Sequence, residues 1–321
     1  MKSDKPTLKK IKGDASFRSF YRKTNNRKNS IIVYAIKEKK KNLLIYDAIN
    51  SLLIENKILA PKLYKENYKK NFIEIEDFGD DTVFTLLKKS GSNKINLYKK
   101  SIDLLSKIQK ITKNRVKDFN GKNYKIAIYE DSKLFKEAKL FSDWYAKKNL
   151  SKKRLLLFNI EINKQLKFLL SNLKSKNDTL VHRDFHVSNL MKYNKELAVI
   201  DTQDALIGNR AYDLASLIDD VRFKSNKKLK DNIYNYYLKM NKNKINRVIL
   251  LNDFEILSVI RNMKIIGIFT RLAVRDKKVK YLKLIPHAWS LIELRIKNNN
   301  IFNNLKRLLD LNFSNKIRNL R

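Results

Sequence analysis

The sequence has 321 residues, a net charge of +39 and no cysteine. This length accommodates two lobes, and the lack of cysteine excludes disulfide bonds and zinc sites built on thiolates. No apolar run follows the charged start of the chain, so we expect no secretory signal, and no apolar stretch approaches the roughly 20 residues that a membrane-spanning helix needs. We therefore expect a cytoplasmic monomer with no membrane contact.

The excess of Lys and Arg, 71 against 32 Asp and Glu, raises the question of nucleic-acid binding. The lysines are spread along the whole chain, and no basic segment is interleaved with aromatic residues as a nucleic-acid platform requires. The chain is also rich in Asn and Ile, whose codons, like those of Lys, are rich in A and T. Scattered charge is typical of a solvated surface, so we predict no nucleic-acid partner.

The beginning of the chain carries strand signals. β-rich runs at 16–23 and 30–37 are separated by the polar link TNNRKN. A helix is predicted over 42–56, where apolar residues recur at helical spacing, and two further strands around a polar turn are predicted within 62–80. This order predicts a small, mostly antiparallel β lobe over 1–80.

From residue 82 the pattern changes to helices. Amphipathic helices are predicted at 95–111 and 153–173, and helices resume at 212–221. The exception is 179–201, where TLVH and ELAVID predict two short strands. We expect one last amphipathic helix in the tail, residues 296–321.

A glycine interrupts the periodicity in DFGDD, which places the linker between the lobes near Phe78 to Asp81. We therefore predict an α+β fold with two lobes, a small β lobe over 1–80 and a large, mainly helical lobe over 81–321.

The rarest side chains of the sequence lie close together. Two of its three histidines lie in VHRDFHVSNL, and IDTQDA follows shortly after. A strand–loop–strand arrangement would bring Asp184, Asn189 and Asp201 to one mouth. Phosphoryl transfer uses such a set, because one carboxylate orients the attacking hydroxyl while an amide oxygen and a second carboxylate hold Mg²⁺ on the nucleotide. We do not expect zinc, since the third histidine is distant and cysteine is absent.

The pattern VHRDFHVSNLM…VIDTQDALIG…YDLASLIDD resembles the aminoglycoside-phosphotransferase-like kinases, which share the protein-kinase fold. The stretches GDASFRSFYR, FIEIEDFGDDT, FSDWYAKKNL and RNMKIIGIFTRLAVRDKKVKYL are similar to those of the bacterial N-acetylmuramate/N-acetylglucosamine kinases, which phosphorylate the anomeric hydroxyl of amino sugars in cell-wall (peptidoglycan) recycling. The resemblance covers about residues 11–290. It implies ATP and Mg²⁺ as cofactors, a nucleotide site in the β lobe, and a catalytic loop and acceptor site in the helical lobe.

The resemblance assigns roles to the residues of the central motif. Asp184 would be the catalytic base on the sugar hydroxyl, and Asn189 and Asp201 would bind Mg²⁺. His182 would brace the loop through backbone bonds. His186 lies beside the base, and its role is either substrate contact or packing.

Four residues are candidates for binding the phosphates of ATP: Gly13, Ser16, Arg18 and Lys37. The small residues let backbone amides approach phosphate, and Lys37 occupies the position of the kinase strand lysine. This lysine stays open, because the sugar kinases often lack it, and its carboxylate partner would be Asp47 or Glu55. The segment from Glu76 to Phe78 is a candidate for main-chain contacts with the adenine edge.

Three residues are candidates for binding the sugar: Trp144, Gln203 and Arg271. Trp144 could stack on a sugar face, although an aromatic residue on a helix is more often part of the core. Gln203 would contact sugar or metal, or cap a turn. Arg271 suits a bidentate grip on a carboxylate such as the lactyl group of N-acetylmuramate. Thr202 departs from the pattern, because kinases commonly have an aromatic residue there.

Three functions follow from this reading. The first is an ATP-dependent kinase of N-acetylmuramate or N-acetylglucosamine. The second is a related kinase of another small alcohol, namely choline, ethanolamine, homoserine or an aminoglycoside; a cationic acceptor would need an acidic cleft. The third is a basic RNA- or partner-binding protein on a catalytically idle kinase scaffold, which an intact Asp-Asn-Asp set argues against.

Overall fold

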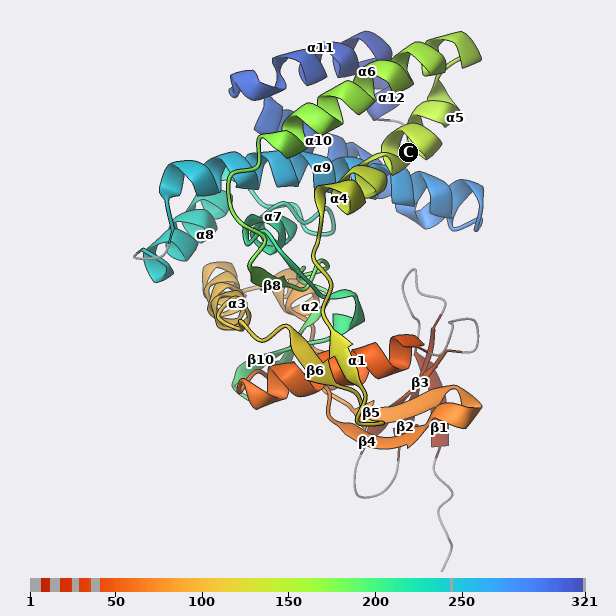
Figure 1. Ribbon diagram of the computed structural model, residues 1–321, viewed down its shortest axis with the longest axis vertical. Helices are drawn as coiled ribbons and strands as arrows, with labels where there is room; N and C mark the ends of the chain where they lie inside the picture. The colour runs from red at the N-terminus through yellow and green to blue at the C-terminus, as the bar shows by residue number, and fades with distance from the viewer. Residues whose placement is uncertain (1–6, 12–17, 25–28, 36–40, 243–244, 320–321) are drawn as a thin grey trace, which may run out of the picture. The chain divides into compact units, whose positions relative to one another are not determined.

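The computed structural model describes residues 7–11, 18–24, 29–35, 41–242 and 245–319. The chain forms two compact units (Figure 1), which we call the β unit, residues 1–127 with 180–207, and the helical unit, residues 128–179 with 208–321. The two lobes predicted over 1–80 and 81–321 group the chain differently and stay a prediction.

A five-stranded antiparallel sheet dominates the β unit, with the strand order β1-β2-β3-β5-β4. The strands are β1 (Thr7–Ile11), β2 (Ser19–Thr24), β3 (Ser30–Tyr34), β4 (Leu63–Asn67) and β5 (Phe72–Glu76). The buried residues of β5 alternate with more exposed ones, as expected of a sheet with one covered face. β1 was not predicted, because most of its side chains are exposed and it lacks apolar alternation.

Helix α1 (Lys41–Glu55) covers the inner face of this sheet. Its Leu43 and Tyr46 pack in one core cluster with Val33, Ile73 and Ile75 of the neighbouring strands β3 and β5. Burial of such side chains stabilises by roughly 1.5–3 kcal/mol each. The helix predicted over 42–56 is therefore present, and its packing on the sheet follows from its apolar side.

Short elements complete the β unit. The helices are α2 (Val83–Lys88) and α3 (Lys94–Ile108), with the 3-10 turns η1 (Tyr68–Lys70) and η3 (Thr202–Asp204). Three two-stranded sheets are formed by β6 (Arg115–Lys117) with β7 (Asn123–Lys125), β9 (Leu190–Tyr193) with β10 (Glu196–Val199), and β8 (Thr179–Val181) with β11 (Leu206–Gly208). The hairpin β6–β7 corrects the expectation of helices alone between 82 and 179.

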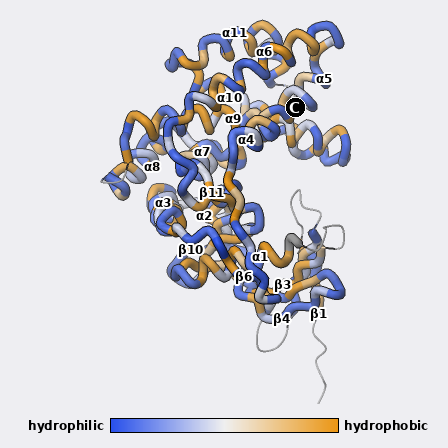
Figure 2. The backbone as a smooth tube through the Cα atoms, in the orientation of Figure 1, coloured by the Kyte–Doolittle hydropathy of each residue, from blue (hydrophilic) through white to orange (hydrophobic). Residues whose placement is uncertain are grey.

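The helical unit is built around one long helix, α9 (Arg247–Val274), most of whose side chains are buried. The elements around it are α4 (Asp131–Ala138), η2 (Phe141–Ala146), α5 (Lys147–Asn149), α6 (Lys152–Ser171), α7 (Ala211–Ile218), α8 (Lys227–Met240), η4 (Val279–Leu284), α10 (Ile285–Ile296), η5 (Asn300–Phe302), α11 (Asn303–Asn312) and α12 (Asn315–Arg318). Hydrophobic and hydrophilic residues alternate along most of these helices (Figure 2), the pattern of amphipathic helices around a shared core.

Aromatic side chains form the centre of this core. Phe141, Tyr145, Trp289 and Phe313 pack with ring centroids 5.2–5.8 Å apart, and Trp289 Nε1 donates to Tyr145 Oη at 3.0 Å. The tail predicted as one helix is instead divided by Phe313, whose extended backbone ends α11 while its ring enters the cluster. Among the described residues, no helix is both long and apolar enough to span a membrane.

Candidate active site

The loop after β8 is tied to the end of β10 through one histidine. His182 Nδ1 accepts a hydrogen bond from the Asp184 amide at 3.3 Å, so Nε2 carries the proton and donates to Ile200 O at 2.9 Å. A ring nitrogen that accepts fixes the tautomer of the other. His182 therefore braces the loop, which connects the segment before Asp184 to the segment before Asp201.

Asp184 and Asn189 are joined within this loop. Asn189 Nδ2 donates to Asp184 O at 3.0 Å, and the His186 amide donates to the same oxygen at 2.9 Å. This bond uses the nitrogen of the Asn189 side-chain amide. Its oxygen, Oδ1, therefore points away from Asp184 O and is the atom that would bind a cation. The ring of His186 is buried and its Nε2 lies 3.4 Å from Asn189 Nδ2, and its predicted role toward substrate stays a prediction.

Asp201 starts the turn η3 with a left-handed backbone, φ 65°. One carboxylate oxygen, Oδ1, accepts from Gln203 Nε2 at 3.0 Å and lies 3.5 Å from the guanidinium of Arg18. Gln203 also donates to Asp204 at 3.3 Å, and its Oε1 has no hydrogen-bond partner among the described residues. These contacts occupy one side of Asp201 and leave Oδ2 for a cation.

The pKa of the Asp201 carboxyl is raised. Desolvation raises it most, Arg18 lowers it, and the neighbouring charge of Asp184 raises it again. Because 41% of the side-chain surface is exposed, solvent moderates this shift. Asp184 and Asp201 disfavour each other's ionisation, and a divalent cation would stabilise both carboxylates in their charged form. This arrangement therefore suits the Mg²⁺ site that the motif predicts.

A buried hydrogen bond that the sequence did not predict anchors the turn to α1. Thr202 Oγ1 donates to Asn50 Oδ1 at 2.6 Å, and Asn50 Nδ2 donates to Pro61 O at 3.1 Å. Both Thr202 and Asn50 are at most 2% exposed. Thr202, noted as a departure from the kinase pattern, therefore supplies a hydroxyl that holds the residue next to Asp201 in place.

The donors fit a hard cation. Among the described residues, no three His, Cys, Asp or Glu side chains gather to hold a metal ion, whereas the set here combines carboxylates with one amide oxygen. Mg²⁺ prefers oxygen ligands and keeps several waters and substrate oxygens, so one amide and one or two carboxylates suffice. Asn189 and Asp201 would therefore hold Mg²⁺, which would neutralise charge on the nucleotide phosphates.

The predicted nucleotide residues divide into described and undescribed ones. Gly13, Ser16 and Lys37 lie outside the described residues. Phe78 is 7% exposed and packs on Tyr193 with ring centroids 4.8 Å apart. The Phe78 amide has no hydrogen-bond acceptor among the described residues, whereas the Glu76 amide donates to Lys62 O at 2.9 Å. A donor on the linker is thus available for a ligand at Phe78.

The two candidate partners of Lys37 differ in their surroundings. Glu55 pairs with Lys113 at 2.9 Å, and 58% of its side chain is exposed. Asp47 is 8% exposed, and burial, with a smaller contribution from Asp118, raises its pKa to about 6. Which of the two pairs with Lys37 stays a prediction, because Lys37 lies outside the described residues.

Two predicted segments of the helical unit pack against each other. Lys264 on α9 pairs with Glu137 on α4 at 2.8 Å. One turn further, Gly267 approaches the backbone so closely that a Cβ atom there would lie 2.3 Å from the carbonyl carbon of Leu140. These two contacts place α9 directly against the segment from α4 to η2.

Arg271 on α9 and Trp144 on η2 are the two sugar candidates that these segments carry. Trp144 lies on η2, a π-helical segment of the kind often found at functional sites, and it is half-buried while its neighbour Tyr145 is in the core. Desolvation, with a smaller contribution from Arg275, lowers the pKa of Arg271, and its Nε has no partner among the described residues. That the two residues together bind the sugar stays a prediction.

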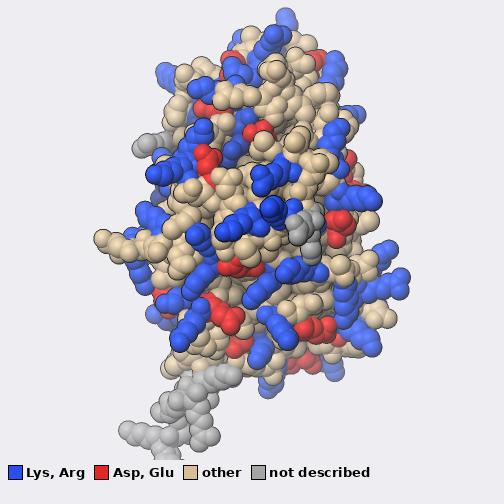
Figure 3. All heavy atoms as spheres, turned by 90° about the vertical axis from the view of Figure 1, so that its left-hand side faces the viewer, with Lys and Arg blue, Asp and Glu red and all other residues tan. Residues whose placement is uncertain are grey.

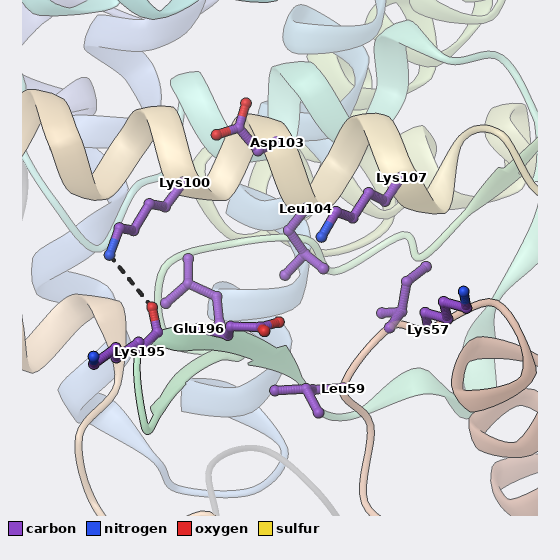
Figure 4. Close-up of a pocket in the computed structure, with 10 residues that line it drawn as sticks. Lys57, Leu59, Lys100, Asp103, Leu104, Lys107, Lys195 and Glu196 are labelled. Carbon is purple, nitrogen blue, oxygen red and sulfur yellow. Dashed lines mark hydrogen bonds between the residues drawn. The ribbon is translucent and has the colours of Figure 1, made fainter.

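A hollow of about 160 Å³ elsewhere in the β unit is lined by four lysines and two acidic residues (Figure 4). Lys100 Nζ is engaged with Lys195 O at 3.4 Å, and the labelled lysines lie around the rim with Glu196 near the middle. The lysines do not converge on one point as an anion site would require. On the face in Figure 3, Lys and Arg are likewise dispersed, which agrees with a solvated surface.

The fold and these side chains define a class of protein. An ethanolamine kinase from Plasmodium vivax has a TM-score of 0.61 at 14% identity, covering 91% of this chain and 82% of that one. An ADP-bound aminoglycoside phosphotransferase has a TM-score of 0.58 at 18% identity, covering 89% and 92%. At these identities the likeness establishes the fold, and it confirms the predicted α+β, protein-kinase-like fold.

The chain belongs to the phosphotransferase enzyme family, whose model matches residues 7–244. It is similar to the N-acetylmuramate/N-acetylglucosamine kinase of Pseudomonas putida, with 25% identity over 292 residues, 89% of this chain and 82% of the relative. The enzyme of the same name from Neisseria meningitidis serogroup B is 27% identical over 280 residues, with 85% and 80% covered. The resemblance inferred from the motifs is therefore confirmed.

Proposed function

We propose that this phosphotransferase is an ATP-dependent, Mg²⁺-requiring kinase that phosphorylates the anomeric hydroxyl of N-acetylmuramate or N-acetylglucosamine, as in the recycling of cell-wall sugars. The observation that carries the proposal is that hydrogen bonds join the loop of Asp184 and Asn189 to the segment of Asp201 within the β unit. His182 donates to Ile200 O, and the Ile200 amide donates to Asn189 O at 3.1 Å, so both residues fix the segment of Asp184 to the segment of Asp201. The names of the relatives support the amino sugar.

In this proposal, Asp184 accepts the proton of the sugar hydroxyl as its oxygen attacks the γ-phosphorus of ATP. The bond from that phosphorus to the bridging oxygen of ADP breaks, and ADP leaves. Positioning and charge neutralisation supply most of the rate enhancement in such transfers. Arg18 and Gln203 hold one oxygen of Asp201, which orients the other toward the cation.

In this proposal, Trp144 and Arg271 of the helical unit bind the acceptor sugar. A half-buried tryptophan provides an apolar face for a sugar ring, and a guanidinium with an unused donor suits a carboxylate. A guanidinium at the acceptor site would repel the cationic choline or ethanolamine and so disfavours them as the acceptor. We therefore expect N-acetylmuramate, which carries a lactyl carboxylate, to be preferred over N-acetylglucosamine.

The test incubates the protein with ATP, Mg²⁺ and a panel of acceptors: N-acetylmuramate, N-acetylglucosamine, choline, ethanolamine, homoserine and an aminoglycoside. Phosphorus NMR and mass spectrometry should detect a phosphate ester on C1 of an amino sugar. Phosphorylation of a different alcohol alone would replace the proposed acceptor, and turnover of none of them would contradict the proposal.

Asp184→Asn provides the mechanistic arm of this test. We expect a loss of at least about 10³-fold in kcat with nucleotide affinity retained, because the base is removed while the fold is unchanged. Asp178→Asn, at a carboxylate 59% exposed a few residues earlier, is the matched control and should retain full activity. Full activity of Asp184→Asn would refute the assignment of the base.

A further inference from the structure

The motif GDASFRSFYR contains two arginines, Arg18 and Arg22, and Arg22 does not contact Asp184, Asn189 or Asp201. Arg22 lies on β2, and its guanidinium makes a two-pronged contact with Asp77, Nε to Oδ2 at 2.5 Å and Nη2 to Oδ1 at 3.0 Å. It also donates to Asp80 Oδ2 at 2.9 Å and to Gly79 O at 3.1 Å. A single side chain of the sheet thus binds three residues of the linker between β5 and α2.

The linker is held at its ends by backbone bonds. The Glu76 amide donates to Lys62 O at 2.9 Å, and the Lys192 amide of β9 donates to Asp81 O at 2.7 Å. Between these two bonds lie Asp77, Gly79 and Asp80, the residues to which Arg22 donates hydrogen bonds. Asp77 Oδ1 in turn accepts from the Gly79 amide at 2.8 Å, and Gly79 adopts a left-handed φ of 82°.

This grip sets the direction of the linker backbone at Phe78. The side chain of Phe78 enters a cluster with Met191 and Ala198 of the hairpin β9–β10. The guanidinium holds the residues on either side of it, so the main-chain groups of Phe78 have one orientation. Charge-assisted forks of this kind combine strength with geometric specificity.

Arg18 lies just before β2, and Arg22 lies on β2 four residues later. Arg18 contacts Asp201, and Arg22 contacts Asp77. Both acidic partners are parts of the proposed nucleotide site, one for the metal and one for the linker. The two arginines therefore connect β2 and the residue before it to the two places where the nucleotide would be held.

We propose that Arg22 is a positioning residue for nucleotide binding, which presents the main-chain groups of Glu76 to Phe78 to the adenine edge through its grip on Asp77, Gly79 and Asp80. This inference rests on the proposed function, because it requires that the linker binds nucleotide. It adds a residue, distant from the phosphates, that sets nucleotide affinity without contacting the reacting atoms.

The chain offers a matched control on the neighbouring residue. Lys23 pairs with Glu74 of β5 at 3.0 Å and so also connects β2 to another part of the sheet, but away from the linker. Its side chain is 29% exposed and that of Arg22 is 21% exposed. Lys23→Met thus removes an ion pair of comparable exposure from the same strand.

The experiment measures the Kd of the non-hydrolysable analogue AMP-PNP, with Mg²⁺, by isothermal titration calorimetry. Arg22→Met should weaken binding about tenfold, the loss expected for charge-assisted hydrogen bonds that orient a binding segment. Arg22→Lys should be intermediate, because an ammonium restores the charge but not the fork. Lys23→Met should bind as the wild type does. Where turnover is measurable, Arg22→Met should raise KM for ATP and leave kcat within about twofold.

Thermal unfolding of each variant separates positioning from folding. Should Arg22→Met not fold, Arg22→Lys and Asp77→Asn carry the test, and both should weaken AMP-PNP binding while remaining folded. Wild-type affinity in the Arg22 variants would overturn the inference, and so would tighter binding, since the guanidinium would then compete with the nucleotide. A wild-type protein that binds no AMP-PNP would instead overturn the proposed function.

Discussion

Asp47, on the buried side of α1, shows how burial changes the chemistry of a single carboxyl group. Its pKa is raised to about 6, first by burial and second by Asp118 on the β6–β7 hairpin. In the unfolded chain the group has its ordinary pKa near 3.8. The folded protein therefore holds this proton more tightly, and the stability that this contributes is complete below about pH 3.8 and is lost as the pH rises to about 6.

Asp47→Asn should therefore stabilise the protein at pH 8, by about 1–3 kcal/mol in the free energy of unfolding, and have little effect at pH 4. Urea unfolding at the two pH values measures the difference. Glu55→Gln, at an exposed carboxylate of the same helix, is the control and should change stability by less than about 0.5 kcal/mol at either pH. Equal stabilities of Asp47→Asn and the wild type at pH 8 would show that the carboxyl is paired or solvated there.

The candidate site could be predicted in part from single residues. The types and spacing of Asp184, Asn189 and Asp201 predicted a phosphoryl-transfer site, because a hard cation and a base need these oxygens. The groups that hold them were not predictable. Thr202 meets Asn50 across 152 residues of sequence, a contact that only the folded chain creates and that no local pattern signals.

At the scale of secondary-structure elements, the contact between α9 and the start of η2 depends on one missing side chain. A Cβ atom on Gly267 would lie 2.3 Å from Leu140 C, 2.4 Å from Leu140 O and 2.6 Å from Phe141 N. These are backbone atoms, which cannot move aside as a flexible side chain can. The glycine is thus required for the two elements to approach, although its helical conformation would suit any residue.

Gly267→Ala should destabilise the protein by about 2–4 kcal/mol, since the helix propensity gained is smaller than the strain of separating two packed backbones. The fall in Tm, followed by circular dichroism, measures this. Val248→Ala, at a position 78% exposed on the same helix, should leave Tm nearly unchanged. An unchanged or higher Tm for Gly267→Ala would contradict the close approach.

Four helices of the helical unit meet at one carboxylate. Asp219, which follows α7, accepts from Ser258 of α9 at 2.5 Å, from Lys230 of α8 at 2.9 Å and from Arg295 of α10 at 2.8 Å. Burial opposes its charge, but Lys230 and Arg295 hold its pKa well below the usual range. The stability from this depressed pKa is present above the ordinary carboxyl pKa near 4 and is lost as the pH falls through the folded value.

Asp219→Asn should cost about 3–5 kcal/mol at pH 7, because two buried cations lose their counter-charge. It should also flatten the dependence of stability on pH below 4, which denaturant titrations at several pH values would reveal. Glu161→Gln, which breaks an exposed pair with Lys164, should cost less than about 1 kcal/mol. A pH profile of Asp219→Asn that parallels the wild type would argue against the buried charge.

The elements that sequence patterns missed share a physical reason. In β6 and β7, the residues are Arg-Val-Lys and Asn-Tyr-Lys, with most side chains exposed, so no apolar alternation marks them. The signal that was present is their turn, where Asp118 accepts from the amides of Asn120 and Lys122, and Gly121 has φ 73°. Strands with one buried face, such as β5, could be predicted because burial imposes a period of two.

For the whole molecule, the dominant electrostatic fact is a charge of +39 spread over the surface. Like charges at this density repel one another and oppose compact folding. Raising NaCl from 20 to 300 mM should therefore raise Tm, by about 2–5 °C, because shortening the screening length weakens the repulsion more than it weakens exposed ion pairs. Differential scanning calorimetry measures the shift. Sodium acetate at equal ionic strength is the control and should act alike, whereas a falling Tm would mean that attractive pairs dominate.

The division of the chain into units has a consequence for its synthesis on the ribosome. The β unit is completed by residues 180–207, which follow 128–179 of the helical unit. At translation rates of about 5–20 residues per second, this interruption lasts roughly 3 to 10 seconds. During that interval, residues 1–127 expose the surface that residues 180–207 later cover. Chaperones would act on the nascent chain in this interval.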